Sequence, residues 1–199
     1  MFFLAALLVI QAPDLSAATH ADAVPVGVAA PVAEKISPGG VRVAIAANNL
    51  TFWWVKDLGA AKWSELPEGS LVGAVRIDKD FRDIRGRVIK AGTFTLRYGI
   101  QPDNGDHLGV SPYRDFLLLS PVALDTDPAA PGHKPLVELS KETIGGSHPA
   151  AWSIDPPVAS GAPLSVHPTE LEHKAVVMEV PAKGATLKFG LVLIGKIEA

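Results

Sequence analysis

The chain has no cysteine among its 199 residues. This excludes disulfide bonds, thiolate zinc sites, iron–sulfur clusters, cysteine nucleophiles and the thiolate ligand of blue copper. An excess of one charge is also lacking, because 18 Lys and Arg stand against 21 Asp and Glu, a formal net charge of −3. That balance favours neither nucleic acid nor an anionic membrane as a partner. The G-x-S-x-G, P-loop and G-x-G-x-x-G motifs are missing too, so an enzyme ranks last among our candidates.

No hydrophobic run is long enough to cross a membrane as a helix. The amino end carries nine apolar residues, 2–10 (FFLAALLVI), whereas a spanning helix needs about 20. Nine residues suit the hydrophobic region of a secretory signal, which needs roughly 7–15. Two small-residue cleavage patterns follow, Ser16-Ala17-Ala18 and the preferred Ala21-Asp22-Ala23. We therefore expect residues 1–23 to be a signal peptide and the protein to be exported, periplasmic or extracellular, without a transmembrane span.

Glycine (18) and proline (17) are frequent and spread along the chain. Such spacing favours many short elements joined by turns. Alternating apolar residues and aromatic or β-branched runs predict strands at 41–46, 51–56, 71–77, 83–89, 93–100, 113–119, 174–180 and 186–194. Residues 90–92 are expected to join two of these strands as a hairpin. Only 136–144 has a helical pattern.

These patterns predict an all-β protein. The expected architecture is an antiparallel β-sandwich, or a jelly-roll-like fold, of about eight strands with one short helix. Residues 24–40 are rich in Ala, Val and Pro and are expected to form an extended N-terminal arm. Residues 41–199 would then form a single β-sandwich domain.

One segment resembles a known group of proteins. Residues 91–119, AGTFTLRYGIQPDNGDHLGVSPYRDFLLL, are similar to a family of uncharacterised secreted bacterial β-sandwich proteins. The later stretch 145–150 looks like a second shared piece. The resemblance implies a β fold and export. It implies no activity and no catalytic residue.

Two loops carry side chains of the kind that bind metal ions. Within 101–112, carboxylates, an amide and an imidazole lie within five positions. Calcium prefers several oxygen ligands, and imidazole suits zinc or copper. The loop 120–135 adds Asp125, Asp127 and a histidine. The candidate metal ligands are His107, His133, His148, Asp103 and Asp106. The alternative is a polar turn in which Asp and Asn bond their own backbone. No cofactor is expected other than a possible Ca, Cu or Zn ion.

Adjacent Trp53 and Trp54 face opposite sides of a strand, so only one is expected to enter the core. The other could stack on a sugar ring or anchor a partner, with packing beneath the 57–70 loop as the alternative. The stretch 76–97 holds seven Lys or Arg and three Asp, a local charge of +4. It could meet an anionic glycan or an acidic partner, but the preferred interpretation is the solvated face of a hairpin.

The leading hypothesis is an exported, non-catalytic binding or interaction module for an unknown protein or glycan. The candidate ligand-binding residues are Asp106, His107, Asp115, His148 and Trp53. The first alternative is a periplasmic metal-binding protein that uses the loop His and Asp residues. The second is a carbohydrate-binding module that uses an exposed Trp. Nucleic acid is not an expected partner.

Overall fold

The computed structural model describes residues 14–102, 111–155 and 161–195. Its strands are β1 (Leu15–His20), β2 (Ile36–Ile45), β3 (Asn48–Val55), β4 (Leu71–Ile77), β5 (Phe81–Arg82), β6 (Val88–Ile89), β7 (Gly92–Ile100), β8 (Asp115–Pro121), β9 (Ala151–Asp155), β10 (Val166–Pro168), β11 (Lys174–Ala182) and β12 (Ala185–Ile194). Two short α-helices, α1 (Ala30–Ala33) and α2 (His133–Lys141), and a 3-10 turn, η1 (Trp63–Glu65), lie between them. None of the helices in these ranges has the length and hydrophobicity of a membrane span.

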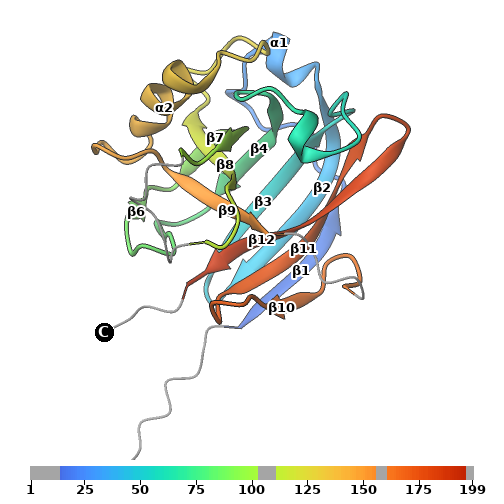
Figure 1. Cartoon of the computed structure of the whole chain (residues 1–199), viewed down its shortest axis with the longest axis vertical. Coiled ribbons are helices and arrows are strands. Elements are labelled where there is room, and N and C mark those ends of the chain that lie inside the picture. Colours follow the sequence, from blue (N-terminus) through green and yellow to red (C-terminus); the bar gives the residue numbers. More distant parts are fainter. Residues whose placement is uncertain (1–13, 103–110, 156–160, 196–199) are drawn as a thin grey trace, which may run out of the picture.

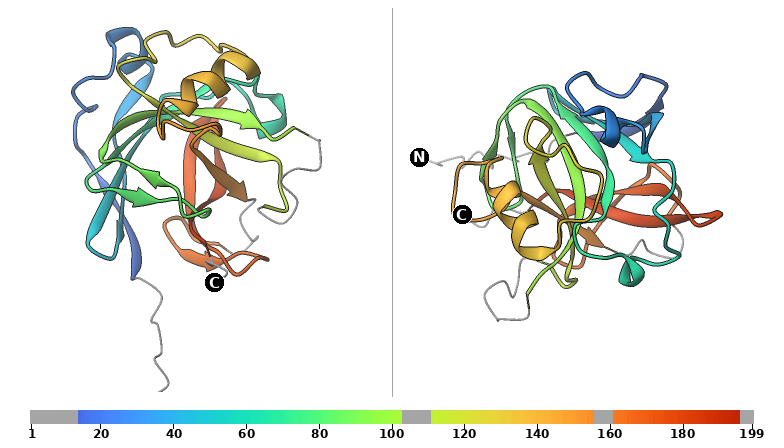
Figure 2. Two further views of the ribbon diagram at one scale, coloured as in Figure 1. Left: turned by 90° about the vertical axis from the view of Figure 1, so that its left-hand side faces the viewer. Right: turned by 90° about the horizontal axis from the view of Figure 1, so that it is seen from above.

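Ten strands form one antiparallel sheet in the order β1-β2-β3-β4-β7-β8-β9-β12-β11-β10. The sheet curls until β11 contacts β3, which makes a nearly closed, barrel-like structure (Figures 1 and 2). Strands β5 and β6 form a separate two-stranded sheet. The antiparallel, mostly β class with few helical residues is therefore confirmed. The eight-strand sandwich is wrong, because a single sheet coils around the core where two stacked sheets were expected.

Two glycines at irregular points of the sheet explain this curvature. The register shifts beside Gly40, in the β2–β3 pair, and beside Gly73, in the β4–β7 pair. A Cβ atom at Gly40 would lie 2.1 Å from the carbonyl oxygen of Phe52, and one at Gly73 would lie 2.1 Å from that of Trp53. Bulges and glycine bends of this kind increase local twist and allow a sheet to close on itself.

The inner face of the sheet is filled by aromatic and aliphatic side chains. Phe52 and Trp54 stack on one another from β3, with ring centroids 5.4 Å apart. Trp152 of β9 meets Phe52 at 5.8 Å, and Phe189 of β12 meets Trp54 edge-on at 5.8 Å. Because all four rings are buried, the inside of the barrel is a packed core.

Two connections pack onto this core from opposite ends of β4. Trp63, on η1 just before β4, contacts Tyr98 and Phe189 with centroid distances of 5.7 and 5.1 Å. Phe81, on β5 just after β4, meets Trp152 at 6.0 Å. Aromatic side chains therefore extend the packed core at both ends of β4.

The expected hairpin with a turn at 90–92 is wrong. Strand β6 pairs with β5, whereas β7 pairs with β4 and β8. The cause is Asp83, whose Oδ1 accepts hydrogen bonds from the backbone N–H groups of Arg85 and Arg87, both at 2.9 Å. These bonds make a tight turn within the segment expected to be a strand.

The N-terminal region adds more to the sheet than expected. Strand β1, inside the range expected as a signal peptide, pairs with β2 from Leu15–Ile45 to His20–Gly40. The range 24–40, expected to be an extended arm, contains α1 and the first half of β2. The N-terminal boundary of the sheet therefore lies before residue 41. Export itself remains a prediction.

Trp53 and Trp54 are both buried, in line with the interpretation that the second ring is packed and not open to a ligand. The outer face of β3 at Trp53 is covered by the residues that follow β1. The indole N–H of Trp53 donates to the Asp22 carbonyl at 3.1 Å, and the His20 ring packs edge-on at 5.1 Å. His20 Nε2 reaches past the side-chain-free Gly40 to the Phe52 carbonyl at 3.0 Å.

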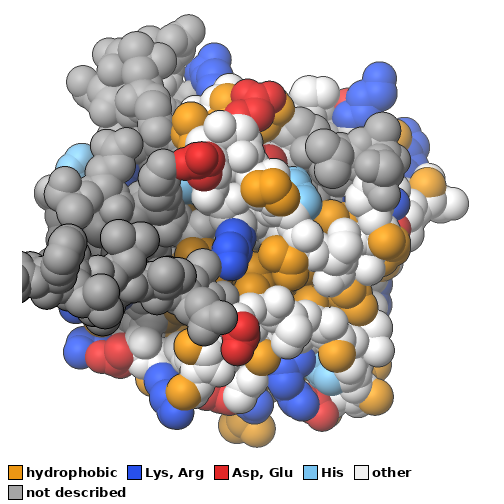
Figure 3. Space-filling model, turned by 90° about the horizontal axis from the view of Figure 1, so that it is seen from below, with side chains coloured by type: hydrophobic (Ala, Val, Ile, Leu, Met, Phe, Trp, Pro, Cys, Tyr) orange, Lys and Arg blue, Asp and Glu red, His pale blue; other side chains and the backbone are white. Residues whose placement is uncertain are grey.

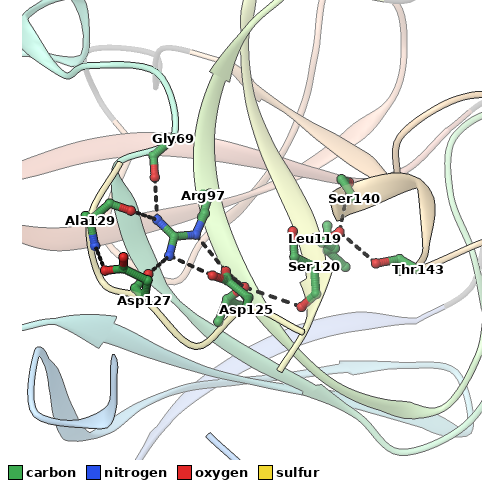
Figure 4. A network of polar contacts seen from close by, with 10 residues as sticks. Gly69, Arg97, Leu119, Ser120, Asp125, Asp127, Ala129, Ser140 and Thr143 are labelled. Carbon is green, nitrogen blue, oxygen red and sulfur yellow. Dashed lines mark hydrogen bonds and ion pairs between the residues drawn. The ribbon is translucent and has the colours of Figure 1, made fainter. Parts of the chain in front are cut away.

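The connection from β8 to α2 is held by a buried ion pair. Arg97, on the outer face of β7 and 1% exposed, binds Asp125 through Nε at 2.6 Å and Nη2 at 2.7 Å (Figure 4). Its Nη1 donates to the carbonyls of Gly69 (2.6 Å) and Ala129 (2.9 Å), and Nη2 also donates to that of Asp127. The Thr95 hydroxyl donates to Asp125 as well. All five N–H groups of the guanidinium are thus used.

Candidate functional site

Only some of the residues expected to form a site lie within the described parts of the chain. Asp103, Asp106 and His107 lie outside the described residues. Asp115 accepts a 2.5 Å hydrogen bond from the hydroxyl of buried Tyr98. Burial, with that hydrogen bond as the second cause, raises the pKa of Tyr98. Asp115 therefore has a structural partner at the edge of the core.

Asp125 and the tryptophans, also candidates from the sequence, make structural contacts. Asp125 is committed to Arg97 and Thr95. Trp53 is fully buried, as are Trp54 and Trp152, and the half-buried Trp63 ring is packed on Tyr98 and Phe189. All four tryptophans lie within the described ranges, and none of them is an exposed side chain.

His133 and His148 are brought together at one pocket. Helix α2 lies across the outer face of β7 and β8, and a cavity of about 100 Å³ remains beside it. The lining residues are Ile84, Arg85, Arg87, Gly99, Ile100, Gln101, Pro102, Phe116, Leu118, His133, Leu136, Val137, His148, Pro149 and Ala151. We call this cavity the α2 pocket.

The walls of the α2 pocket are mainly apolar. Phe116 and Leu118 alternate with core-facing residues of β8, so they point outward and pack against Leu136 of α2. Gly99 allows this close packing, because a Cβ there would lie 2.5 Å from Leu118 Cδ1. The apolar surface suits a hydrocarbon or aromatic group.

Basic groups stand at the edge of these apolar walls. Asp83 organises the 83–87 turn and pairs with Arg87, through Nε at 2.8 Å and Nη2 at 2.7 Å. The remaining nitrogen, Arg87 Nη1, is buried and has no hydrogen-bond partner. Burial, followed by the charge of Arg87, lowers the pKa of Arg85. Arg85 and Arg87 thus place two basic side chains at the pocket, and Arg87 is paired with the buried Asp83 carboxylate.

His133 is oriented by a carboxylate. Its Nδ1 lies 2.9 Å from Glu68 Oε1, which also accepts the backbone N–H of Ile100 at 2.9 Å. The pocket thus has an imidazole fixed by a second residue. Among the described residues, however, no group of three His, Cys, Asp or Glu side chains is placed to hold a metal ion. The described residues therefore do not assemble the expected metal site.

Most charges of the basic stretch 76–97 are paired. Arg76 binds Asp78 at 3.2 Å, Lys90 binds Asp80 at 2.8 Å, and Arg87 binds Asp83. On the face shown in Figure 3, hydrophobic side chains gather near the centre and acidic and basic side chains are interspersed around them. The exposed Arg76–Asp78 and Lys90–Asp80 pairs agree with a solvated, mixed-charge surface for the stretch 76–97. Sequence reasoning missed the pocket because its lining residues come from separate segments; of these, His133 and His148 were singled out for their imidazoles and Arg85 and Arg87 for their charge.

Strand β9 places two polar side chains, Ser153 and Asp155, on its outer face. Asp155 is 5% exposed, and burial raises its pKa to about 6. Its Oδ1, the Ser153 hydroxyl and His167 Nε2 are all buried without a hydrogen-bond partner. Buried polar atoms almost always have hydrogen-bond partners, so these three unpaired atoms are exceptions.

No family model matches the sequence, and neither curated proteins nor solved structures give a significant match. Function must therefore be argued from the site alone.

Proposed function

We propose that the protein is a non-catalytic binding module whose α2 pocket takes a small molecule with an apolar body and an anionic head. The observation that carries this proposal is Arg87 Nη1, a charged donor that is buried at an apolar pocket and has no partner. A carboxylate or phosphate oxygen is the acceptor that a guanidinium prefers.

The pocket dimensions limit the apolar part. An apolar cavity of roughly 150 Å³ can take up benzene, and the α2 pocket measures about 100 Å³. It therefore suits a short alkyl chain or one edge of an aromatic ring, held against the apolar lining that includes Phe116 and Leu136. The head group would remain at the arginine wall, where Asp83 already fixes the guanidinium of Arg87. A preformed donor of this kind lowers the entropy cost of binding.

Benzoate and hexanoate are suitable probes, with benzyl alcohol and hexanol as neutral counterparts. Titration calorimetry should show that the acids bind and that each alcohol binds at least about tenfold more weakly, since a charged hydrogen bond contributes about 1.5–3 kcal/mol. Equal affinity for acids and alcohols would argue against a role for Arg87.

Three variants make the test specific. Ala151→Leu should fill the pocket and abolish binding of both acids. Arg87→Lys keeps a cation beside Asp83 but removes the guanidinium, so it should weaken the acids and leave the alcohols unchanged. Arg82 lies on the same turn and bonds the Gly86 carbonyl, outside the pocket lining. Arg82→Gln is therefore the matched control and should bind like the parent protein.

A further inference from the structure

We propose that a cavity between the two ends of the ten-stranded sheet binds an uncharged molecule with an apolar body and a carbonyl oxygen, to which Trp54 donates its indole N–H. The cavity shares no lining residue with the α2 pocket. The proposal therefore does not depend on the proposed function.

The cavity lies where the curled sheet almost closes. Strands β1, β2 and β3 form one end of the sheet, and β12, β11 and β10 form the other. Strand β11 contacts β3, and an open cavity of about 350 Å³ lies between β1–β3 on one side and 163–164, β11 and β12 on the other. We call it the seam cavity. Pockets that bind small molecules usually measure about 300–1,000 Å³, so its size suits a ligand.

Hydrogen bonds hold the two walls of the seam cavity together at one end. The backbone N–H of Leu58, just after β3, donates to the Pro181 carbonyl of β11 at 2.9 Å. The backbone N–H of Lys183, in the β11–β12 turn, donates to Asp57 Oδ1 at 2.7 Å. Because these bonds fix the walls before a ligand arrives, less ordering is needed on binding.

Trp54 directs an unused donor into the seam cavity. Its side chain is 5% exposed and lines the cavity, and its Nε1 is buried without a hydrogen-bond partner. A Cβ on Gly73, which pairs with Trp54 from β4, would lie 3.1 Å from Trp54 Cε3. The six-membered ring of the indole therefore faces β4. Nε1 is on the opposite edge of the indole and faces β2, whose residues 37–41 line the cavity.

This position distinguishes Trp54 from the other tryptophans. The indole nitrogens of Trp63 and Trp152 are also buried without a partner, but neither residue lines the seam cavity or the α2 pocket. Of these three side chains, Trp54 is the one with its ring at a cavity.

The lining of the seam cavity favours an uncharged ligand. Among the described residues that line it, the only charged one is Glu179, which lies 3.8 Å from Lys188. A carboxylate without an arginine or lysine on the same wall disfavours an anion. The other lining side chains are mainly apolar, including those of Val41, Val55 and Leu164.

The single buried donor defines the polar group of the ligand. An indole N–H can only donate, so its partner must be an acceptor. A ketone, ester or amide oxygen accepts a hydrogen bond without carrying a charge into the apolar part of the cavity. Such an oxygen at Nε1 would supply the partner that a buried N–H normally has.

Acetophenone and α-methylstyrene are matched probes, because they have the same shape and differ in a C=O or C=CH₂ group. In ¹H–¹⁵N spectra of the full chain, acetophenone should shift the Trp54 indole resonance in a saturable way. Titrations should show that α-methylstyrene binds about fivefold more weakly, since one neutral hydrogen bond is lost.

Three variants locate the effect. Trp54→Phe should bind the two probes equally, because the donor is gone while an aromatic ring remains. Trp63→Phe removes an unpartnered indole N–H outside the seam cavity, so it is the matched control and should keep the parent preference. Ala151→Leu, which fills the α2 pocket, should leave acetophenone binding at the seam cavity unchanged. The shift of the Trp54 resonance in the parent chain decides the question even if Trp54→Phe folds poorly.

Three results would overturn the proposal. The first is a Trp54 indole resonance that does not move at high acetophenone concentration. The second is equal affinity of the parent chain for acetophenone and α-methylstyrene. The third is loss of acetophenone binding in Ala151→Leu, which would place the probe in the α2 pocket.

Discussion

Replacing Arg97 with methionine should be among the most destabilising single changes in the protein. The substitution roughly preserves side-chain volume but removes five N–H donors from the Asp125 carboxylate and the carbonyls of Gly69, Asp127 and Ala129. Asp125 is 4% exposed, so its charge would stay buried with Thr95 as its remaining side-chain donor. Breaking a buried pair in this way costs about 3–5 kcal/mol. That is a large part of a typical stability of about 5–15 kcal/mol.

The double variant Arg97→Met with Asp125→Leu separates two explanations for that loss. If the cost comes from an orphaned buried charge, removing the carboxylate should restore a good part of the stability. Urea unfolding followed by tryptophan fluorescence measures both free energies. A double variant no more stable than Arg97→Met, or a loss below about 1 kcal/mol in the single variant, would refute the reasoning.

Two further predictions concern backbone shape and pH. Gly73→Ala would place a Cβ 2.1 Å from the Trp53 carbonyl oxygen. We therefore expect the β3–β4 pairing to loosen and the thermal midpoint to fall by several degrees. Gly59 has open space around it but a φ of +73°, so Gly59→Ala should lower the thermal midpoint less. Burial lowers the pKa of His173, so the unfolded chain binds more protons and stability falls as the pH drops below about 6.5. His173→Gln should show a smaller loss of unfolding free energy between pH 7.5 and pH 5; an unchanged or larger loss would contradict this explanation.

Local patterns in the sequence predicted most strands well, because alternation depends only on which face of a strand is buried. The segments 71–77 and 186–194 fall on β4 and β12. The helix expected at 136–144 begins three residues earlier, at His133. Closure of the sheet was not predictable in the same way. It depends on bulges at Gly40 and Gly73, and a glycine in a sequence does not show which carbonyl lies against it.

The candidate sites were harder to predict for a related reason. His133 and His148 were chosen for their chemistry, and the structure does bring both to one pocket. What the pocket offers a ligand, however, is an apolar wall and Arg87 Nη1. Arg87 Nη1 has no hydrogen-bond partner because Asp83 binds the other two nitrogens of the guanidinium. This arrangement depends on how the 83–87 turn folds, so the sequence alone does not show it.

Strand β1 leads to a last prediction, which revises the cleavage site expected for export. Cleavage after Ala23 would remove β1 and with it His20 and Asp22, which cover Trp53. Exposing a buried aromatic ring costs about 2 kcal/mol, and losing its hydrogen bond costs about 1 kcal/mol more. We therefore expect any mature form to begin before Leu15. A chain of residues 24–199 should be about 3 kcal/mol less stable than one of 14–199 in urea and should have red-shifted tryptophan emission. Equal stability and emission would show that β1 is dispensable, and an exported protein whose intact mass corresponds to a start at Val24 would restore the original cleavage site.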